Sequence, residues 1–143
     1  MKAGLRPALL LLLLAACVDV NTPGTQVVTW QGTLVPVLSH PDLAGQVAAA
    51  AQGASGTDVG IGISGAGPGA VHAWGVGSGT CAAPGALLGA STDYPLLAAD
   101  DSGKAAAQTH LITRLSADSA YHGELWQSAT DTTRIACGNL EKR

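Results

Sequence analysis

The feature that most constrains this chain is a hydrophobic pattern that repeats every two residues, in short runs separated by glycine- and proline-rich turns. Val59, Ile61 and Ile63 alternate with glycine or polar residues, as in a β-strand with one buried face. Turn-forming residues cluster at 65–69 and 100–103, and no long segment has the period of a helix. The pattern therefore predicts an all-β sandwich or barrel of seven or eight short strands.

The individual strands can be placed along the chain. Residues 27–35 are predicted to form a long first strand, in which Gly32 marks a bulge or a close approach of backbones. The four alanines at 48–51 favour a helix intrinsically, but Gly45 and Gly53 bracket them too closely for a stable one. A strand is therefore predicted there as well. Further strands are expected within residues 71–76, 105–112, 120–127 and 134–140.

The composition excludes two classes of protein. Charged residues make up 12% of the chain, the formal net charge is −3, and no basic cluster occurs, so binding of nucleic acid through its phosphates is not expected. Apolar residues reach 47% without any block of like charges, which argues against intrinsic disorder.

The first residues have the pattern of an export signal. Lys2 and Arg6 precede the apolar run at 8–16, which is too short to remain as a membrane span. Residues 14–17, Leu-Ala-Ala-Cys, resemble the lipobox of bacterial lipoproteins. In that family the chain is cut before the cysteine, here Cys17, which then carries acyl chains. The alternative is an ordinary signal peptide with a chance cysteine near its end.

The resemblance to lipoproteins predicts the organisation of the chain. A signal peptide over 1–16 would be followed by the lipidated Cys17 and a polar, turn-rich tether to residue 25, with one domain over 26–143. Loss of Lys2 and Arg6 would change the formal net charge from −3 to −5. The partner so implied is a membrane, bound through several acyl chains, on the periplasmic face of an outer membrane or at the cell surface.

Two cysteines remain beyond the leader, Cys81 and Cys137. An even number in an exported chain predicts one disulfide. Two free thiols, or half of a metal site, are the alternatives.

Two other patterns are weaker. Residues 60–65 match the glycine fingerprint of dinucleotide-binding proteins, but no helix follows to receive a pyrophosphate, so a strand running into a turn is predicted. The chain has four histidines, His40, His72, His110 and His122. They do not have the spacing of metal ligands, and the side chains of His40 and His110 are expected to be exposed to solvent.

Two longer segments resemble parts of Cu/Zn superoxide dismutases. Residues 69–81 are similar to the copper-binding strand and the disulfide loop that follows it, and 133–140, Thr-Arg-Ile-Ala-Cys-Gly-Asn-Leu, to the family's Ser-Arg-Leu-Ala-Cys-Gly ending. Residues 94–103 resemble the stretch after the zinc loop. The resemblance implies a Greek-key barrel of about eight antiparallel strands. It also implies that His72 braces the ligand strand and that Arg134 stands at the position of the arginine that guides superoxide in that family.

The metal ligands of that family do not carry over. Its two copper histidines on the first of these strands fall at Gly75 and Gly77, and a third falls at Trp126. No histidine lies between Cys81 and Asp93, and one carboxylate does not make a zinc site. We therefore expect no copper or zinc cofactor and no dismutase activity. Arg134 would instead pair with an acid or donate to loop carbonyls.

Three functions follow as hypotheses. The first is a lipid-anchored, non-enzymatic structural or binding module with a dismutase-like barrel. The second is a cryptic copper- or zinc-binding protein, or a weak superoxide dismutase, and an unrelated metal site would draw on His72, His122, Asp93 or Glu124. The third is a binder of small ligands or polysaccharides, with a cleft lined by Trp74, Trp126 and Tyr121, although burial in the core is expected for at least two of them.

Overall fold

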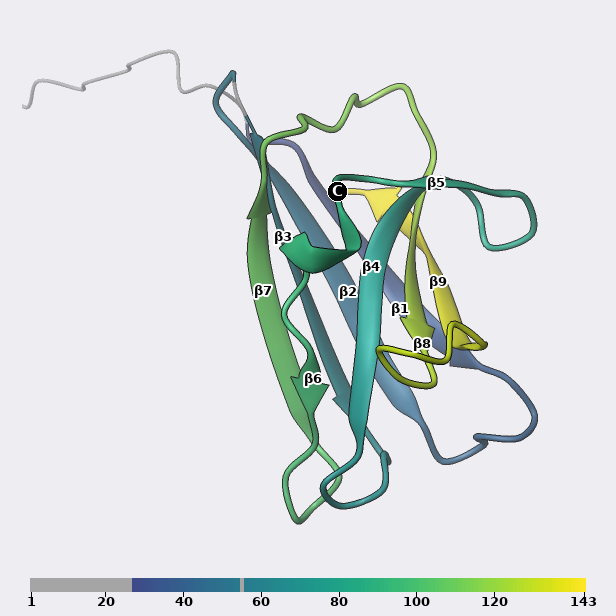
Figure 1. Ribbon diagram of the computed structural model, residues 1–143. Helices are drawn as coiled ribbons and strands as arrows, with labels where there is room; N and C mark the ends of the chain where they lie inside the picture. Colours follow the sequence, from purple (N-terminus) through teal and green to yellow (C-terminus); the bar gives the residue numbers. More distant parts are fainter. Residues whose placement is uncertain (1–26, 55) are drawn as a thin grey trace, which may run out of the picture.

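The computed structural model describes residues 27–54 and 56–143, which form one antiparallel β-structure (Figure 1). A single 3-10 turn, η1 (Ser91–Asp93), is the only helical element in these residues. The strands, in chain order, are β1 (Thr29–Pro36), β2 (Ala44–Gln52), β3 (Gly56–Ser64), β4 (Val71–Gly79), β5 (Pro84–Leu87), β6 (Leu97–Ala98), β7 (Ala105–Leu111), β8 (Tyr121–Trp126) and β9 (Arg134–Lys142). The predicted all-β class is confirmed.

The strands lie in the order β5-β4-β8-β9-β1-β2-β3-β7, and β6 pairs with β4. The sheet curls into a half-barrel, with β4 and β7 at facing sides (Figure 1). Two connections, β3 to β4 and β7 to β8, cross between distant strands, as Greek-key connections do. Every strand pair is antiparallel.

The period-two pattern explains the long hairpin of β2 and β3. Val59, Ile61 and Ile63 are buried, while the residues between them are less so. The alanines at 48–51 lie in β2 and pair with β3, as predicted. Gly32 lies in β1 where a methyl group would collide with the backbone oxygen of Asn139. The close approach of backbones predicted at this glycine is therefore confirmed.

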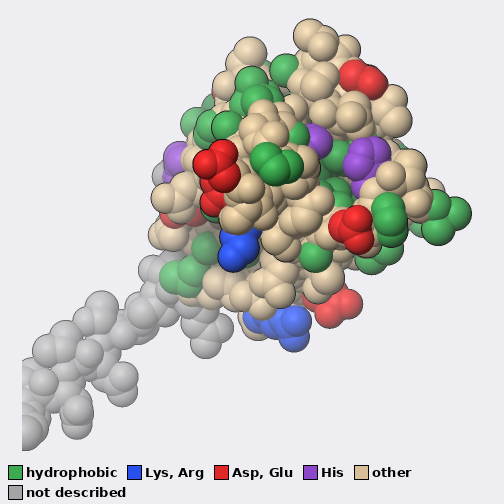
Figure 2. Space-filling model, turned by 90° about the horizontal axis from the view of Figure 1, so that it is seen from below, with side chains coloured by type: hydrophobic (Ala, Val, Ile, Leu, Met, Phe, Trp, Pro, Cys, Tyr) green, Lys and Arg blue, Asp and Glu red, His purple; other side chains and the backbone are tan. Residues whose placement is uncertain are grey.

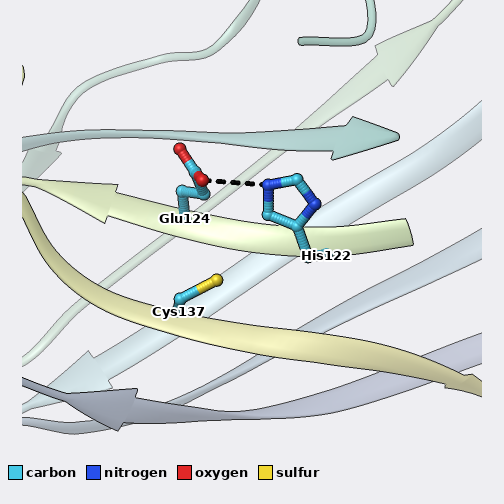
Figure 3. Close-up of side chains that lie close together, drawn as sticks. All are labelled: His122, Glu124 and Cys137. Atoms are coloured by element: carbon cyan, nitrogen blue, oxygen red, sulfur yellow. Dashed lines mark hydrogen bonds and ion pairs between the residues drawn. The ribbon is translucent and has the colours of Figure 1, made fainter. Parts of the chain in front are cut away.

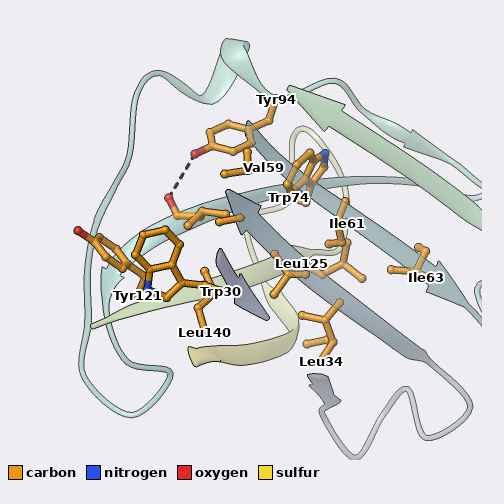
Figure 4. Packing of buried hydrophobic residues seen from close by; sticks show 14 of the residues in the cluster. Trp30, Leu34, Val59, Ile61, Ile63, Trp74, Tyr94, Tyr121, Leu125 and Leu140 are labelled. Carbon is orange, nitrogen blue, oxygen red and sulfur yellow. Dashed lines mark hydrogen bonds between the residues drawn. The ribbon is translucent and has the colours of Figure 1, made fainter. Parts of the chain in front are cut away.

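The core lies inside the curl of the sheet and contains two aromatic pairs (Figure 4). Trp30 meets Tyr121 edge to face with ring centroids 6.1 Å apart, and Trp74 meets Tyr94 at 5.1 Å. Tyr121 is only 8% exposed and Trp74 1%, so the burial expected for at least two of the three aromatic residues Trp74, Trp126 and Tyr121 is confirmed.

Three short elements were missed by the sequence analysis: β5, η1 and β6, all between β4 and β7. The signal peptide, Cys17 and the tether lie outside the described residues, so those predictions stay predictions. No helix within residues 27–54 and 56–143 is long and apolar enough to cross a membrane. The face seen in Figure 2 carries scattered acidic and basic side chains among uncharged ones.

Candidate functional site

The outer face of β4 and β8 contains the positions at which the resemblance places copper ligands. Gly75 pairs with Glu124 and Gly77 with His122, while Trp126 lies opposite Ala73. Because side chains alternate along a strand, these residues share one face. The three expected positions therefore lie on one face of two neighbouring strands, where the ring of Trp126 reaches the position of Gly75.

The space beside the two glycines belongs to side chains from neighbouring strands. A methyl group at Gly75 would collide with Leu87 and lie 3.1 Å from the ring of Trp126. A methyl group at Gly77 would lie 2.8 Å from Cε1 of His122. Glycine and tryptophan offer no side-chain donor to copper, and a histidine at either glycine would displace its neighbours. The residues present do not fit the copper centre of the resembled enzymes.

A polar cluster lies on the same face, formed by side chains of β8 and β9 (Figure 3). His122 and Glu124 point toward each other from β8, with Nε2 and Oε1 2.9 Å apart. The His122 side chain is 1% exposed and that of Glu124 15%. His122 Nδ1 is buried and makes no hydrogen bond to any described residue. Buried polar atoms normally have partners, so this nitrogen is an exception.

Arg134 joins the cluster from β9. Its Nη1 atom donates to Glu124 Oε1 over 3.2 Å and to the backbone oxygen of Cys81 over 3.1 Å. The expected role for this arginine, pairing with an acid or donating to loop carbonyls, is confirmed on both counts. The Glu124 carboxylate thus has a guanidinium and an imidazole at one oxygen, which offsets the cost of burying its charge.

The Cys81–Cys137 disulfide completes the cluster and confirms the predicted bond. It joins the loop after β4 to β9, with the two Cα atoms 5.9 Å apart. The side chain of Asn139 holds the same loop, because its Oδ1 accepts a hydrogen bond of 2.8 Å from the Cys81 backbone nitrogen. The donor atoms of His122, Glu124 and Cys137 all lie within 4.8 Å of one another.

The other residues singled out in the sequence lie elsewhere. His72 is buried, and its Nδ1 lies 3.0 Å from the backbone oxygen of Gln127, so it braces the start of β4 against the end of β8. Asp93 accepts a hydrogen bond from the Ala90 backbone nitrogen at η1. His110 lies 2.7 Å from Asp58, with both side chains about half exposed.

His40, the remaining histidine, is half-buried and lies 3.0 Å from the hydroxyl of the neighbouring Ser39. Only His122 and Glu124, among the residues that the sequence suggested for an unrelated metal site, come together. Their spacing of two residues on a strand was the signal for this, since it places both side chains on one face.

A groove of about 550 Å³ lies beside Trp126, at the end of β8. No charged residue lines it; its walls combine aromatic or apolar side chains with four hydroxyl groups, from Ser91, Thr92, Ser128 and Thr132. Trp74 and Tyr94 reach it, but both are almost fully buried. Trp74 Nε1 donates to the Pro95 oxygen over 2.7 Å, which fixes the wall.

Tyr94 is held in that wall by its hydroxyl group. The hydroxyl donates to the Leu88 backbone oxygen over 2.6 Å, with the Val76 oxygen 3.3 Å away. Burial raises the pKa of Tyr94 to about 12, because the phenolate would lose its solvation. The group therefore stays protonated at neutral pH and acts as a hydrogen-bond donor.

No protein-family model matches the sequence, and no curated protein is significantly similar to it.

Proposed function

We propose that this chain is a lipid-anchored protein of the bacterial envelope, whose dismutase-like barrel serves as a structural or binding module and not as an enzyme. The export and the anchor rest on Lys2, Arg6 and the apolar run that ends at Cys17. Acyl chains on that cysteine would hold the domain at a membrane through a short polar tether.

The packing around Gly75 and Gly77 carries the non-enzymatic part of the proposal. Dismutation of superoxide requires a metal ion that alternates between two oxidation states, and copper in such a site needs imidazole ligands. At the corresponding positions this chain offers two glycines and Trp126, and neighbouring side chains occupy the adjacent space. The nearest imidazole, on His122, is already paired with Glu124.

Metal content and activity test this part. The full chain, purified from membranes under oxidising conditions, is incubated with Cu²⁺ and Zn²⁺, desalted, and analysed for both metals and for superoxide dismutation. We expect well under one copper per chain and a rate equal to that of the buffer, with a Cu/Zn superoxide dismutase as the positive control. Stoichiometric copper together with dismutation would overturn the proposal in favour of a weak dismutase.

The anchor has its own test. Replacement of Cys17 by alanine should move the protein from the membrane fraction to the soluble fraction, and the intact mass of the wild-type chain should include acyl groups. A mature wild-type protein of unmodified mass in the soluble fraction would contradict lipidation while leaving the barrel's proposed role unaffected.

The groove beside Trp126 favours binding of a small uncharged ligand as a second candidate function. Its volume lies within the range of small-molecule sites, and an aromatic side chain with surrounding hydroxyl groups suits a neutral sugar ring. Titration with neutral oligosaccharides, followed by tryptophan fluorescence, should show saturable binding that is lost in Trp126→Ala. Equal signals from both proteins would argue against this site.

A further inference from the structure

We propose that reduction of the Cys81–Cys137 disulfide creates a zinc site, formed by the two cysteine sulfurs together with His122 and Glu124. This inference goes beyond the proposed function, which concerns the oxidised protein, and does not rest on it. None of the four residues occupies a position at which the resemblance places a metal ligand. The site would be closed in the oxidised chain and available only in the reduced one.

The donor atoms already lie close together. Those of His122, Glu124 and Cys137 are within 4.8 Å of one another, and Cys81 adds a second sulfur bonded to that of Cys137. Zinc takes four such ligands in a tetrahedron at about 2.0–2.3 Å, which places donor atoms about 3.3–3.8 Å apart. Shifts of about 1 Å would therefore bring the donors of His122, Glu124 and Cys137 to this spacing, and the sulfur of Cys81 would move further, because it must separate from that of Cys137.

The chemistry of the donors selects zinc over a hard cation. Two thiolates and an imidazole are ligands that zinc prefers, and the carboxylate of Glu124 can supply a fourth. In the oxidised chain neither sulfur can act as a thiolate, which leaves one imidazole and one carboxylate. Two ligands do not make a structural zinc site, so the disulfide controls whether the site exists.

The surroundings of His122 prepare it for this role. Its side chain is 1% exposed, and Nε2 faces the cluster, 2.9 Å from the oxygen of Glu124 (Figure 3). The ring packs over Gly77 of β4, where a methyl group would lie 2.8 Å from its Cε1. A ligand fixed in this way loses little freedom when the metal binds, which favours affinity.

The reaction balances with a dithiol as reductant. The dithiol gives two electrons and two protons to the Cys81–Cys137 bond and becomes a disulfide itself, leaving two thiols in the protein. One Zn²⁺ then binds both sulfurs and releases the two thiol protons to solvent. Attack can begin at Cys81, which is partly exposed and lies beside the exposed residues 82–86, whereas Cys137 is buried.

The positive charge of Arg134 should weaken the binding of zinc at this site. Its Nη1 lies 3.2 Å from the Glu124 oxygen and 3.9 Å from the sulfur of Cys137. A divalent ion among these donors would meet the positive charge of the guanidinium at short range. Removal of that charge should therefore strengthen zinc binding, although the same arginine supports the fold through its bond to Cys81.

Cobalt serves as the coloured probe for zinc. The full chain is reduced under argon with a water-soluble phosphine, which takes up oxygen from water as it is oxidised and binds metals weakly, and is then titrated with Co²⁺. We expect one Co²⁺ per chain, a sulfur-to-cobalt charge-transfer band, and loss of the band when Zn²⁺ is added. The oxidised chain should show no band.

Variants identify the ligands. In the reduced state His122→Asn and Glu124→Gln should each weaken Co²⁺ binding at least tenfold, and Arg134→Gln should strengthen it several-fold. His110→Asn is the matched control, because His110 also lies beside a carboxylate, that of Asp58, but far from the disulfide in the exposed part of the sheet. It should leave the affinity unchanged.

The outcomes decide the proposal even if reduction unfolds the chain. In that case Zn²⁺ should restore the far-ultraviolet dichroism of the folded wild type and fail to do so in His122→Asn, because the metal binds only the assembled site. Absence of binding by the reduced chain, or equal binding by wild type and His122→Asn, would overturn the proposal. Neither result affects the proposed function, which is tested on the oxidised protein.

Discussion

The two faces of β4 and β8 differ in what holds their side chains. On the inner face Trp74, Val76 and Leu125 are at most 1% exposed and belong to the apolar core. On the outer face His122 and Glu124 are also largely buried, but by the disulfide-linked loop and β5, and they are held by polar contacts. The curl of the sheet alone buries the side chains of the inner face. Burial on the outer face depends on a cover, which consists of the disulfide-linked loop and β5.

Removal of the disulfide should have the largest effect, because it releases that cover. In Cys81→Ala/Cys137→Ala the unfolded chain is no longer restricted by a cross-link spanning 56 residues, and we expect a loss of about 4 kcal/mol in the free energy of unfolding. Urea denaturation of the variant and the oxidised wild type measures it. A loss below about 1 kcal/mol would mean that the cover is held by other contacts, such as those of Asn139.

Truncation on the inner face should come next. Leu125 is 0% exposed, so Leu125→Ala leaves a cavity and should cost about 3 kcal/mol in the same denaturation experiment. Ile112→Ala is the control, because that side chain is 87% exposed and its loss should change stability by less than about 0.5 kcal/mol. Equal losses in the two variants would show that the apolar core is not where the structure places it.

Alkaline pH tests the part of the inner face near Tyr94. The pKa of this tyrosine is about 12 in the folded protein and 10.0 ordinarily, so above pH 10 the unfolded chain releases its proton first. The stabilisation is fully present below pH 10 and is lost as the pH rises to about 12, amounting to about 2–3 kcal/mol. The difference in unfolding free energy between wild type and Tyr94→Phe, measured from pH 8 to 12, should shrink accordingly. A constant difference would refute the shift.

Loss of a single polar contact should give the smallest change, and the two histidine–carboxylate pairs of the molecule can be compared directly. Glu124→Gln removes the charge that faces His122 and Arg134 in a buried setting, and should cost about 1 kcal/mol. Asp58→Asn does the same to the pair with His110, whose side chains are about half exposed, and should cost close to zero. Urea denaturation at pH 7 compares them; equal costs would mean that the cover does not shield the cluster from water.

The sequence predicted the strands whose side chains alternate most clearly. Val59, Ile61 and Ile63 fixed which face of β3 is buried, and the bracketing glycines correctly excluded a helix at 48–51. The elements β5 and β6 were missed, because strands of four and two residues carry too little pattern and form by pairing with β4. Burial of at least two of Trp74, Trp126 and Tyr121 was expected, but not which two, because an aromatic residue in a strand gives no sign of which face it occupies.

The candidate site was predictable only in part. The disulfide came from the even number of cysteines beyond the leader, whereas the role of Arg134 and the convergence of Gly75 and Trp126 came from the resemblance. The meeting of His122 and Glu124 with Cys137 could not be foreseen, because it depends on the register between β8 and β9, in which Glu124 lies opposite Cys137. No local sequence signal specifies that register.

The short strands β5 and β6 have a consequence for how copies of this chain meet one another. β4 has nine residues, and without neighbours on its free side it would expose a long row of unpaired backbone groups. β5 pairs with one end of that side and β6 with the other (Figure 1). Exposed strand edges recruit further strands and lead to aggregation. The two elements, too small to be predicted, thus keep both ends of this side of β4 from pairing with another copy, while β7 forms the other edge of the sheet.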